Sequence, residues 1–420
     1  MKPVPRGGQP GSSEAAHEDI PARAVNRWYE SVMGFSPELV DTLLERLSPS
    51  GEGWLLDPFC GAGTSLVQAK KSGIAALGID ANPFMVHSAW AKTRWKVDGA
   101  VLLEKARTAV ELVTASGYVC DGWAPDVVER GWLWPSVWRQ AISLRAAIRG
   151  ITNQVHMRIL EAALAWAVVD KASNVGFGPE AYHVSRLGRI SVPTIFLGRV
   201  AEMVSDLEGI PSLAKNTPVM VVKGDARNVA SLIPARLRGQ ITAVITSPPY
   251  PAEHDYTRIT RVELELLGYV SSKEDLRSIK ERMLRSNSKT VYSGDNDYRF
   301  VKGSKRLRAL VRRVERSASK KDYGFARQYP KVLREYFGGL YRHLEGIASV
   351  LPRGAKCAYV LGEQCSYFGH KVETASLLAG MLRHGRLPLR VVGIETVRIR
   401  KATRGTRRPI KEEALFLERE

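Results

Sequence analysis

The stretch that decides the fold is Gly53-Trp54-Leu55-Leu56-Asp57-Pro58-Phe59-Cys60-Gly61-Ala62-Gly63-Thr64. Its apolar first half predicts a buried strand, and a helix is expected from Ser65 to about Ser72. The glycines between them allow a tight turn, and free N–H groups at the start of the helix can hold a polar ligand. Residues 75–80 then form a second short apolar strand. Strand, glycine turn, helix and strand predict a βαβ unit of a parallel sheet.

The pattern of the glycine turn restricts the ligand. A dinucleotide-binding turn has a third glycine in the third position after Gly63, where this chain has Leu66. A phosphate-binding P-loop has a lysine directly after the last glycine, where this chain has Thr64. Asp80 ends the second strand, and a carboxylate there can accept hydrogen bonds from both hydroxyls of a ribose. We therefore expect an adenosine ligand without a pyrophosphate; an ordinary glycine turn of an α/β protein is the alternative.

A second informative stretch, Thr246-Ser247-Pro248-Pro249-Tyr250, directly follows a predicted buried strand over 241–245. Open α/β sheets bind ligands at the carboxyl edge of such strands. The two prolines fix the backbone and remove two N–H donors, so carbonyl oxygens are rigidly presented. A carbonyl there can accept a hydrogen bond from an exocyclic amino group while Tyr250 stacks on the ring that carries it. The alternative is a rigid loop that packs Tyr250 into the core.

Together the two motifs resemble those of the DNA amino-methyltransferases, which methylate N4 of cytosine or N6 of adenine. The resemblance implies a Rossmann-like α/β sheet that binds S-adenosyl-L-methionine. Residues 20–23, Ile-Pro-Ala-Arg, look like the family's N-terminal motif that closes over the cofactor. By the resemblance, the catalytic residues are Ser247, Pro248, Pro249 and Tyr250. The implied cofactor-binding residues are Ala22, Arg23, Asp57, Pro58, Phe59, Gly61, Gly63, Thr64, Asp80, Asp225 and Ala226.

The first residue of the proline motif favours one target base. Family members that methylate adenine usually have Asp there, whereas those that methylate N4 of cytosine usually have Ser, so Ser247 favours N4-cytosine. We expect direct methyl transfer to the amino nitrogen of a base flipped out of double-stranded DNA. Methylation at C5 of cytosine needs a cysteine after a proline, and the chain has no Pro-Cys pair. The alternatives are an N6-adenine DNA methyltransferase, an RNA guanine-N2 methyltransferase and an inactive DNA-binding homologue.

The charge of the chain is strongly basic and unevenly placed. The 420 residues carry a formal net charge of +19, and most of the excess lies in 271–330 and 385–409. Clustered Lys and Arg side chains neutralise phosphates and release counterions, so the charge predicts a polyanionic partner, and the family resemblance implies that this partner is double-stranded DNA. The alternative is a solvated helix face. The predicted DNA contacts are Arg258, Lys302, Lys305, Arg306, Arg308, Arg312 and Arg313.

The chain divides into successive predicted segments. Residues 1–18 are polar and rich in Gly, Ser and Pro, which predicts a disordered tail. A mainly helical insertion at 98–214 and a basic insertion at 269–330 are expected to interrupt one methyltransferase core. The basic insertion is the first candidate for target recognition, and the helical insertion is the second. The predicted core segments are 19–97, 215–268 and 331–420.

Several features bear on the compartment. No apolar run approaches the roughly 20 residues that span a bilayer, and the N-terminus lacks the apolar stretch of a signal peptide. The four cysteines have no metal-binding spacing and predict reduced thiols. We expect a cytoplasmic, nucleoid-associated protein that needs neither metal nor membrane. In a restriction–modification system, a cognate restriction endonuclease would be a further partner.

Replacing Arg306, Arg308, Arg312 and Arg313 together with glutamine should flatten the salt dependence of DNA binding. Each lost phosphate contact should reduce the slope of log affinity against log salt by about 0.9, because fewer counterions are released. Fluorescence anisotropy of a labelled duplex over a salt series measures this slope. An unchanged slope would show that these arginines point away from the DNA.

Overall fold

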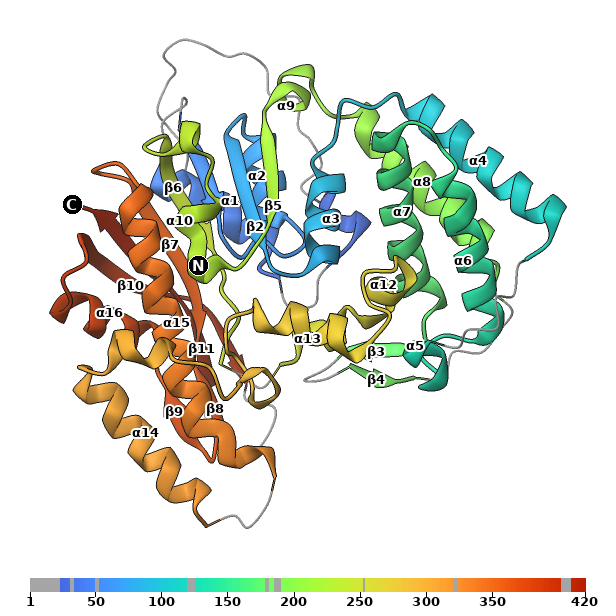
Figure 1. The fold of residues 1–420 in the computed structure, drawn as a ribbon. Helices are drawn as coiled ribbons and strands as arrows, with labels where there is room; N and C mark the ends of the chain where they lie inside the picture. Colours follow the sequence, from blue (N-terminus) through green and yellow to red (C-terminus); the bar gives the residue numbers. More distant parts are fainter. Residues whose placement is uncertain are drawn as a thin grey trace, which may run out of the picture.

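The computed structural model describes residues 23–30, 34–49, 53–118, 125–177, 181–184, 190–251, 254–320, 324–401 and 409–420. Its centre is a seven-stranded sheet with the order β10-β11-β7-β6-β1-β2-β5 (Figure 1). The glycine motif follows β1 (Trp54–Asp57), and the proline motif begins at the end of β6 (Ile241–Thr246). The other strands are β2 (Ala75–Asp80), β5 (Val219–Lys223), β7 (Lys356–Gly362), β10 (Leu389–Lys401) and β11 (Pro409–Arg419).

The strand directions make this a mostly parallel sheet. β1 is parallel to β2 and β6, and the pairs β2–β5 and β6–β7 are also parallel. Only β11 runs against its neighbours β7 and β10. The predicted Rossmann-like α/β fold is therefore confirmed. From β1 the chain builds towards β5 and then returns to the opposite side of β1 at β6, so the strand order reverses between β1 and β6. Open sheets bind ligands at the carboxyl ends beside such a reversal.

Both faces of the sheet are covered because successive side chains of a strand point to opposite faces. Leu55 belongs to an apolar cluster with the helices α1 (Pro37–Leu47) and α2 (Thr64–Lys71). Leu56 belongs to a separate cluster with α15 (Tyr329–Val350) and α16 (Thr374–His384). The short α10 (Val229–Leu232) packs against α15 on this second face. Buried strands with apolar residues on both faces are typical of parallel sheets.

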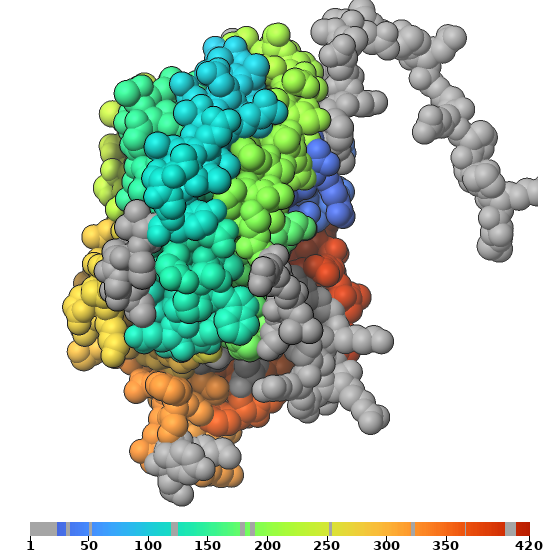
Figure 2. Space-filling view, turned by 90° about the vertical axis from the view of Figure 1, so that its right-hand side faces the viewer, coloured from blue at the N-terminus to red at the C-terminus, as the bar shows by residue number. Residues whose placement is uncertain are grey.

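The described residues of the range 98–214 are mainly helical and stand beside the β5 edge of the sheet, where α3 (Pro83–Lys92) contacts both β5 and α7 (Figure 1). From Ile159 to Ala167 every residue of α7 is buried, and the stretch is apolar except for Glu161, which pairs with Arg149. Figure 2 shows these helices as a continuous surface of cyan to green residues. The helices are α4 (Gly99–Ser116), α5 (Asp126–Glu129), α6 (Pro135–Arg149), α7 (Gln154–Ala167), α8 (Val192–Glu208) and α9 (Ser212–Asn216). A short π-helix, η2 (Val168–Ala172), and the antiparallel pair of β3 (Val175–Phe177) and β4 (Ala181–His183) complete the described part of the region.

The basic region 269–330 packs on two different parts of the molecule. Ile279 of α13 (Lys273–Glu281) joins the core of the helical region, whereas Leu307 of α14 (Lys305–Ala318) joins the cluster around α15. Between these helices lie the short turns η5 (Ser288–Thr290) and η6 (Asp297–Val301), and η7 (Phe325–Gln328) leads into α15. The division into core and insertions stays a prediction.

The remaining elements are short. They are η1 (Asn26–Trp28), η3 (Ala226–Asn228), η4 (Ala235–Leu237), α11 (Tyr256–Ile259), α12 (Arg261–Leu266), β8 (Gln364–Tyr367) and β9 (His370–Val372). Among the helices of the described residues, none is long and apolar enough to cross a membrane. The predicted tail 1–18 lies outside the described residues.

A glycine-to-alanine substitution should separate tight packing from helix propensity. A Cβ at Gly338 of α15 would lie 2.1 Å from the carbonyl oxygen of Asp297, so backbone would have to shift. We expect Gly338→Ala to lower the free energy of unfolding by about 1–3 kcal/mol. Gly198→Ala in α8 meets no atom within 4 Å and is the matched control, with an expected gain of up to about 1 kcal/mol. Urea unfolding followed by circular dichroism measures both; equal midpoints would contradict the packing argument.

Candidate active site

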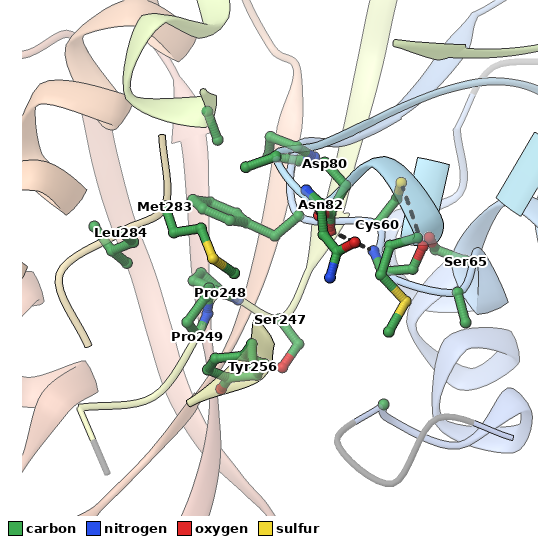
Figure 3. Close-up of a pocket in the computed structure, with 18 of the residues that line it drawn as sticks. Cys60, Ser65, Asp80, Asn82, Ser247, Pro248, Pro249, Tyr256, Met283 and Leu284 are labelled. Carbon is green, nitrogen blue, oxygen red and sulfur yellow. Dashed lines mark hydrogen bonds between the residues drawn. The ribbon is translucent and has the colours of Figure 1, made fainter. Parts of the chain in front are cut away.

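A cavity of about 1140 Å³, open to solvent, lies at the carboxyl ends of β1, β2 and β6. In Figure 3 Asp80 and Asn82 lie on one side, Ser247 and Pro248 below them, and Met283 on the opposite side. The predicted site residues that line the cavity are Pro58, Phe59, Gly61, Thr64, Asp80, Ala226, Ser247, Pro248, Pro249 and Tyr250. The glycine motif and the proline motif therefore face the same space.

A buried carboxylate joins the two motifs. Asp57, which is 1% exposed, accepts hydrogen bonds from the Thr246 hydroxyl at 2.6 Å and from the Phe59 amide at 3.1 Å. The Ser65 hydroxyl donates to its second oxygen. Burial raises the pKa of Asp57 to about 6, against the lowering effect of the hydrogen bonds from Ser65 and Thr246. Asp57 was predicted to bind the cofactor, but the structure places it beneath the cavity wall, where it ties β1 to β6.

The two glycines of the first motif have different positions. Gly61 has a φ of +49°, lines the cavity and donates its N–H to the Asp80 carboxylate at 3.0 Å. Gly63 has a φ of +87°, and a Cβ there would lie 2.9 Å from the Cβ of Ala89 on α3. Gly63 is therefore needed for the close approach of α2 and α3 and is not part of the cavity lining.

Asp80 presents a carboxylate at the cavity wall. Besides the Gly61 amide, the backbone N–H of Asn82 donates to it at 2.8 Å. Burial raises the pKa of Asp80 to about 6, and the backbone hydrogen bonds act in the opposite direction. Asn82 in turn caps α3 by accepting from the Phe84 amide at 3.0 Å. Asp80 is thus fixed between a turn and a helix start.

The proline motif is held by aromatic and acidic neighbours. The Ser247 hydroxyl lies 3.4 Å from the Tyr250 hydroxyl, which donates to the Glu412 carboxylate of β11 at 3.2 Å. The Tyr250 amide donates to the hydroxyl of Tyr256 at 3.2 Å. A Cβ at Gly362 would lie 2.6 Å from the Tyr250 ring, so the glycine makes room for that ring. Contacts with β7, β11 and Tyr256 therefore hold Tyr250 in place.

Further residues line the cavity that the sequence did not single out. Asn82 could have been found from its local pattern, because Asn followed by Pro83 is typical of a helix start. Arg282, Met283 and Leu284 follow α13 in the basic region and have no local signal; their position depends on packing. The others are Gly34, Phe35, Cys60, Ala62, Ser65, Ala81, Met85 and Tyr256.

Besides Asp57 and Gly63, two more predicted cofactor residues, Asp225 and Arg23, lie away from the cavity lining. The Asp225 carboxylate pairs with Arg227 at 2.7 Å, and Arg227 also pairs with the buried Asp297 at 2.9 Å. Arg23 is exposed and precedes η1, which Asp206 of α8 anchors by accepting from the Val25 amide at 2.9 Å. Ala22 lies outside the described residues.

The predicted DNA contacts fall into two places. Lys302 and the cations of α14 are exposed. α14 lies beside α15 and β9, and in Figure 1 it stands apart from β2 and β6. Arg306 of α14 donates to the Ser376 hydroxyl at 3.3 Å, while Lys305, Arg308, Arg312 and Arg313 are also exposed. Arg258 instead lies on α11, next to a second, smaller cavity.

Similar proteins point to methyltransferases. The chain is 25% identical over 291 residues to the Type II methyltransferase M.BsoBI of Geobacillus stearothermophilus, which covers 62% of this chain and 56% of that protein. Over 50 residues it is 46% identical to the Type II methyltransferase M.MjaII of Methanocaldococcus jannaschii, covering 12% of this chain and 9% of that protein. The chain thus spans about half or less of the length of these relatives. Both matches agree with the resemblance that the two motifs carry and support methyltransferase chemistry.

Two further comparisons add little. No protein-family model matches the chain. Solved structures similar to it include TrmN from Thermus thermophilus, at 11% identity and a TM-score of 0.32 over 95% of this chain and 53% of that one. The rRNA methyltransferase aviRa from Streptomyces viridochromogenes has 10% identity and a TM-score of 0.33 over 97% and 94%. Scores at this level carry no argument about the substrate.

The position of Asp80 predicts a pH-dependent affinity for an adenosine ligand. Its pKa of about 6 means that the carboxylate loses its charge as the pH falls through 6, and an ionised carboxylate accepts ribose hydrogen bonds more strongly. Calorimetric affinity for S-adenosylhomocysteine should therefore fall between pH 8 and pH 5. Asp80→Asn should bind about tenfold more weakly at pH 8 and lose this pH dependence.

The matched control is Glu263→Gln, because burial raises the pKa of Glu263 to about 7 but this residue does not line the cavity. We expect that variant to keep the pH dependence. An Asp80→Asn variant with wild-type affinity would contradict the ribose assignment.

Proposed function

We propose that this protein is a DNA methyltransferase that transfers a methyl group from S-adenosyl-L-methionine to N4 of cytosine in double-stranded DNA. The observation that carries the proposal is the shared cavity. Asp57 and Thr246, which stand 189 positions apart in the chain, are hydrogen-bonded, so the glycine and proline motifs open into the same space. Taken singly, the glycine motif could be an ordinary turn and the proline motif a rigid loop. Because both motifs line one cavity, a single site can bind the cofactor at one motif and the target base at the other. The similarity to Type II methyltransferases supports the same conclusion.

The residues of the cavity fit the cofactor. The Asp80 carboxylate suits the two ribose hydroxyls, and Phe59 and Leu284 provide apolar walls for a flat purine. Gly61 leaves the start of α2 free of side-chain bulk. When bound, the cofactor supplies a methyl group on a positively charged sulfur. The protein would hold the adenosine end of the cofactor at Asp80, so that the end that carries the methyl group points towards Ser247.

The proline motif is suited to hold the target base. The Pro248–Pro249 pair keeps the loop rigid, so the Ser247 oxygen and nearby carbonyls can accept hydrogen bonds from an exocyclic amino group. Such bonds draw the nitrogen lone pair out of conjugation with the ring and orient it. Positioning of this kind, together with exclusion of water, is the catalytic contribution that we assign to the motif.

Tyr250 is suited to stack on an extruded base. Its ring packs against Gly362, and its hydroxyl is held by Glu412 at 3.2 Å. Tyr256, whose pKa burial raises to about 12, stays neutral beside it and accepts from the Tyr250 backbone. A ring fixed at both its edge and its hydroxyl loses little freedom when a base stacks on it, which favours capture of a flipped base.

Ser247 supports cytosine over adenine as the target. An N6-adenine enzyme would use the same cavity and the same cofactor, so the modified atom must be identified directly. The proposal also includes action on nucleoid DNA in the cytoplasm, with a cognate restriction endonuclease as partner if the enzyme serves a restriction–modification system.

Tyr250→Ala should abolish methyl transfer while sparing cofactor binding. Removing the ring takes away the stacking surface, and we expect the rate to fall by at least about 100-fold. Tyr250→Phe keeps the ring but loses the hydroxyl contacts to Ser247 and Glu412, so a smaller loss is expected. Transfer of labelled methyl groups to unmethylated genomic DNA measures the rate, and calorimetry measures cofactor affinity. Loss of cofactor affinity in Tyr250→Ala would place the tyrosine in the wrong part of the site.

The base is identified by mass spectrometry of nucleosides from DNA of cells that express the protein, followed by base-resolved sequencing. N4-methylcytosine is the expected product. N6-methyladenine would replace the proposed base, and an unmodified genome beside modified RNA would overturn the proposal.

A further inference from the structure

A second cavity, of about 430 Å³, lies next to the first. Asp255 lines the second cavity, and the following residue, Tyr256, lines the first. Three separate parts of the chain meet here: the helical region, the segment after the proline motif, and the basic region. Besides Asp255, the residues that line the second cavity are Asp126, Arg130, Trp132, Arg258, Arg261 and Lys289.

The lining of this cavity is positively charged. Arg130, Arg258, Arg261 and Lys289 face two carboxylates, and both carboxylates are already paired. Asp126 accepts from Arg130 at 2.6 Å and from Arg261 at 3.3 Å. Asp255 pairs with Lys280, which does not line the cavity, at 2.7 Å. A concave surface with an excess of one charge concentrates ions of the opposite sign.

The geometry of the arginines is set by an aromatic ring. The guanidinium carbons of Arg130 and Arg258 lie 5.8 Å and 5.7 Å from the centre of the Trp132 ring. Trp132 is only 4% exposed, so the ring itself is fixed by the core of the helical region. Contact with the ring holds the planar guanidinium groups, which match the geometry of phosphate oxygens.

Burial of Arg261 adds to this arrangement. Its side chain is 15% exposed and lies 3.4 Å from the Glu265 carboxylate as well as near Asp126. A cation removed from water is costly unless it is paired or serves a ligand. Here the pairing keeps Arg261 at the wall of the cavity, so the positive charge is already placed before any ligand arrives.

We propose that this second cavity binds a phosphodiester group of the DNA strand that carries the target base. The inference rests on the proposed function, because a base that enters the first cavity brings its own backbone to the neighbouring surface. The forked geometry of guanidinium groups suits phosphate oxygens. The two cavities are neighbours, because Asp255 lines the second and the next residue, Tyr256, lines the first. A phosphate held here fixes the strand while its base turns into the first cavity.

The proposal gives the helical region a direct part in DNA binding. Arg130 and Trp132 come from that region, whereas Arg258 follows the proline motif and Lys289 belongs to the basic region. The two insertions are therefore not alternative DNA-binding surfaces, since both contribute to one phosphate site. The exposed cations of α14 would serve a more distant part of the duplex.

The test compares two arginine substitutions in the full chain with S-adenosylhomocysteine present. Arg258→Gln should weaken binding of a labelled short duplex about tenfold and reduce the salt slope by about 0.9. The matched control is Arg236→Gln, which removes the same charge from η4, an exposed turn that precedes β6 at the amino end of that strand. That control should leave affinity and slope unchanged. Arg258→Lys should restore the slope but only part of the affinity, because it keeps the charge without the planar fork.

Two further measurements separate the possible failures. Equal behaviour of Arg258→Gln and Arg236→Gln would overturn the proposal, as would a parallel loss of S-adenosylhomocysteine affinity in Arg258→Gln, which indicates a structural role. An RNA hairpin that depends on Arg258 more strongly than the duplex would overturn DNA as the source of the phosphate. The proposed function is tested separately: it would be contradicted if the wild-type protein transferred no methyl group. The binding measurements test the phosphate site whether or not methyl transfer is found.

A methylphosphonate substitution gives the sharpest form of the test. Replacing one phosphate beside the methylated base with this uncharged group should weaken binding by the wild-type protein. The same replacement should cost Arg258→Gln little, because the contact is already lost. Equal costs in both proteins, at every position tried, would contradict a phosphate contact at Arg258.

Discussion

The carboxylate of Asp57 is the contact on which the rest of the site depends. It receives the Thr246 hydroxyl from β6, the Phe59 amide from the turn after β1 and the Ser65 hydroxyl from α2. The two strands lie side by side where the strand order reverses, and this reversal opens a crevice that neither strand fills. Burying a charge is costly, but the three donors compensate and link both motifs to one point. In the function proposed above, this link sets the distance between an adenosine at Asp80 and a target base at Ser247.

The positive charge of the chain is distributed according to what each part packs against. In α14 the apolar residues Leu307, Leu310 and Val314 are buried in the cluster around α15, so the arginines between them face outward. The end of α13 behaves differently, because Met283 and Leu284 form a wall of the first cavity. The basic region therefore supplies both a charged outer helix and an apolar part of the wall of the first cavity.

Local patterns predicted the fold well because they depend on neighbouring residues. The glycine turn, the buried strands and the proline motif at the end of β6 follow from steric limits and from alternating apolar side chains. The surroundings of single side chains were harder to predict. Asp57 and Asp225 match the family motifs in sequence, yet neither lines the cavity. Asp57 accepts from the Thr246 hydroxyl, and Asp225 pairs with the Arg227 guanidinium. Thr246 lies 189 positions from Asp57, and Arg227 is itself held by Asp297, 70 positions further along the chain, so local sequence does not reveal these environments.

From the sequence alone, the βαβ unit, the proline motif at a strand end and the excess of positive charge were determined, because each is a property of residues close together in the chain. The tertiary structure alone decided that both motifs open into one cavity, that Arg282–Leu284 contribute to its wall, and that Arg130 and Arg258 both approach the ring of Trp132. These last features join segments that are distant in sequence. Their positions result from the packing of the helical region and the sheet around shared apolar cores, which no local pattern encodes.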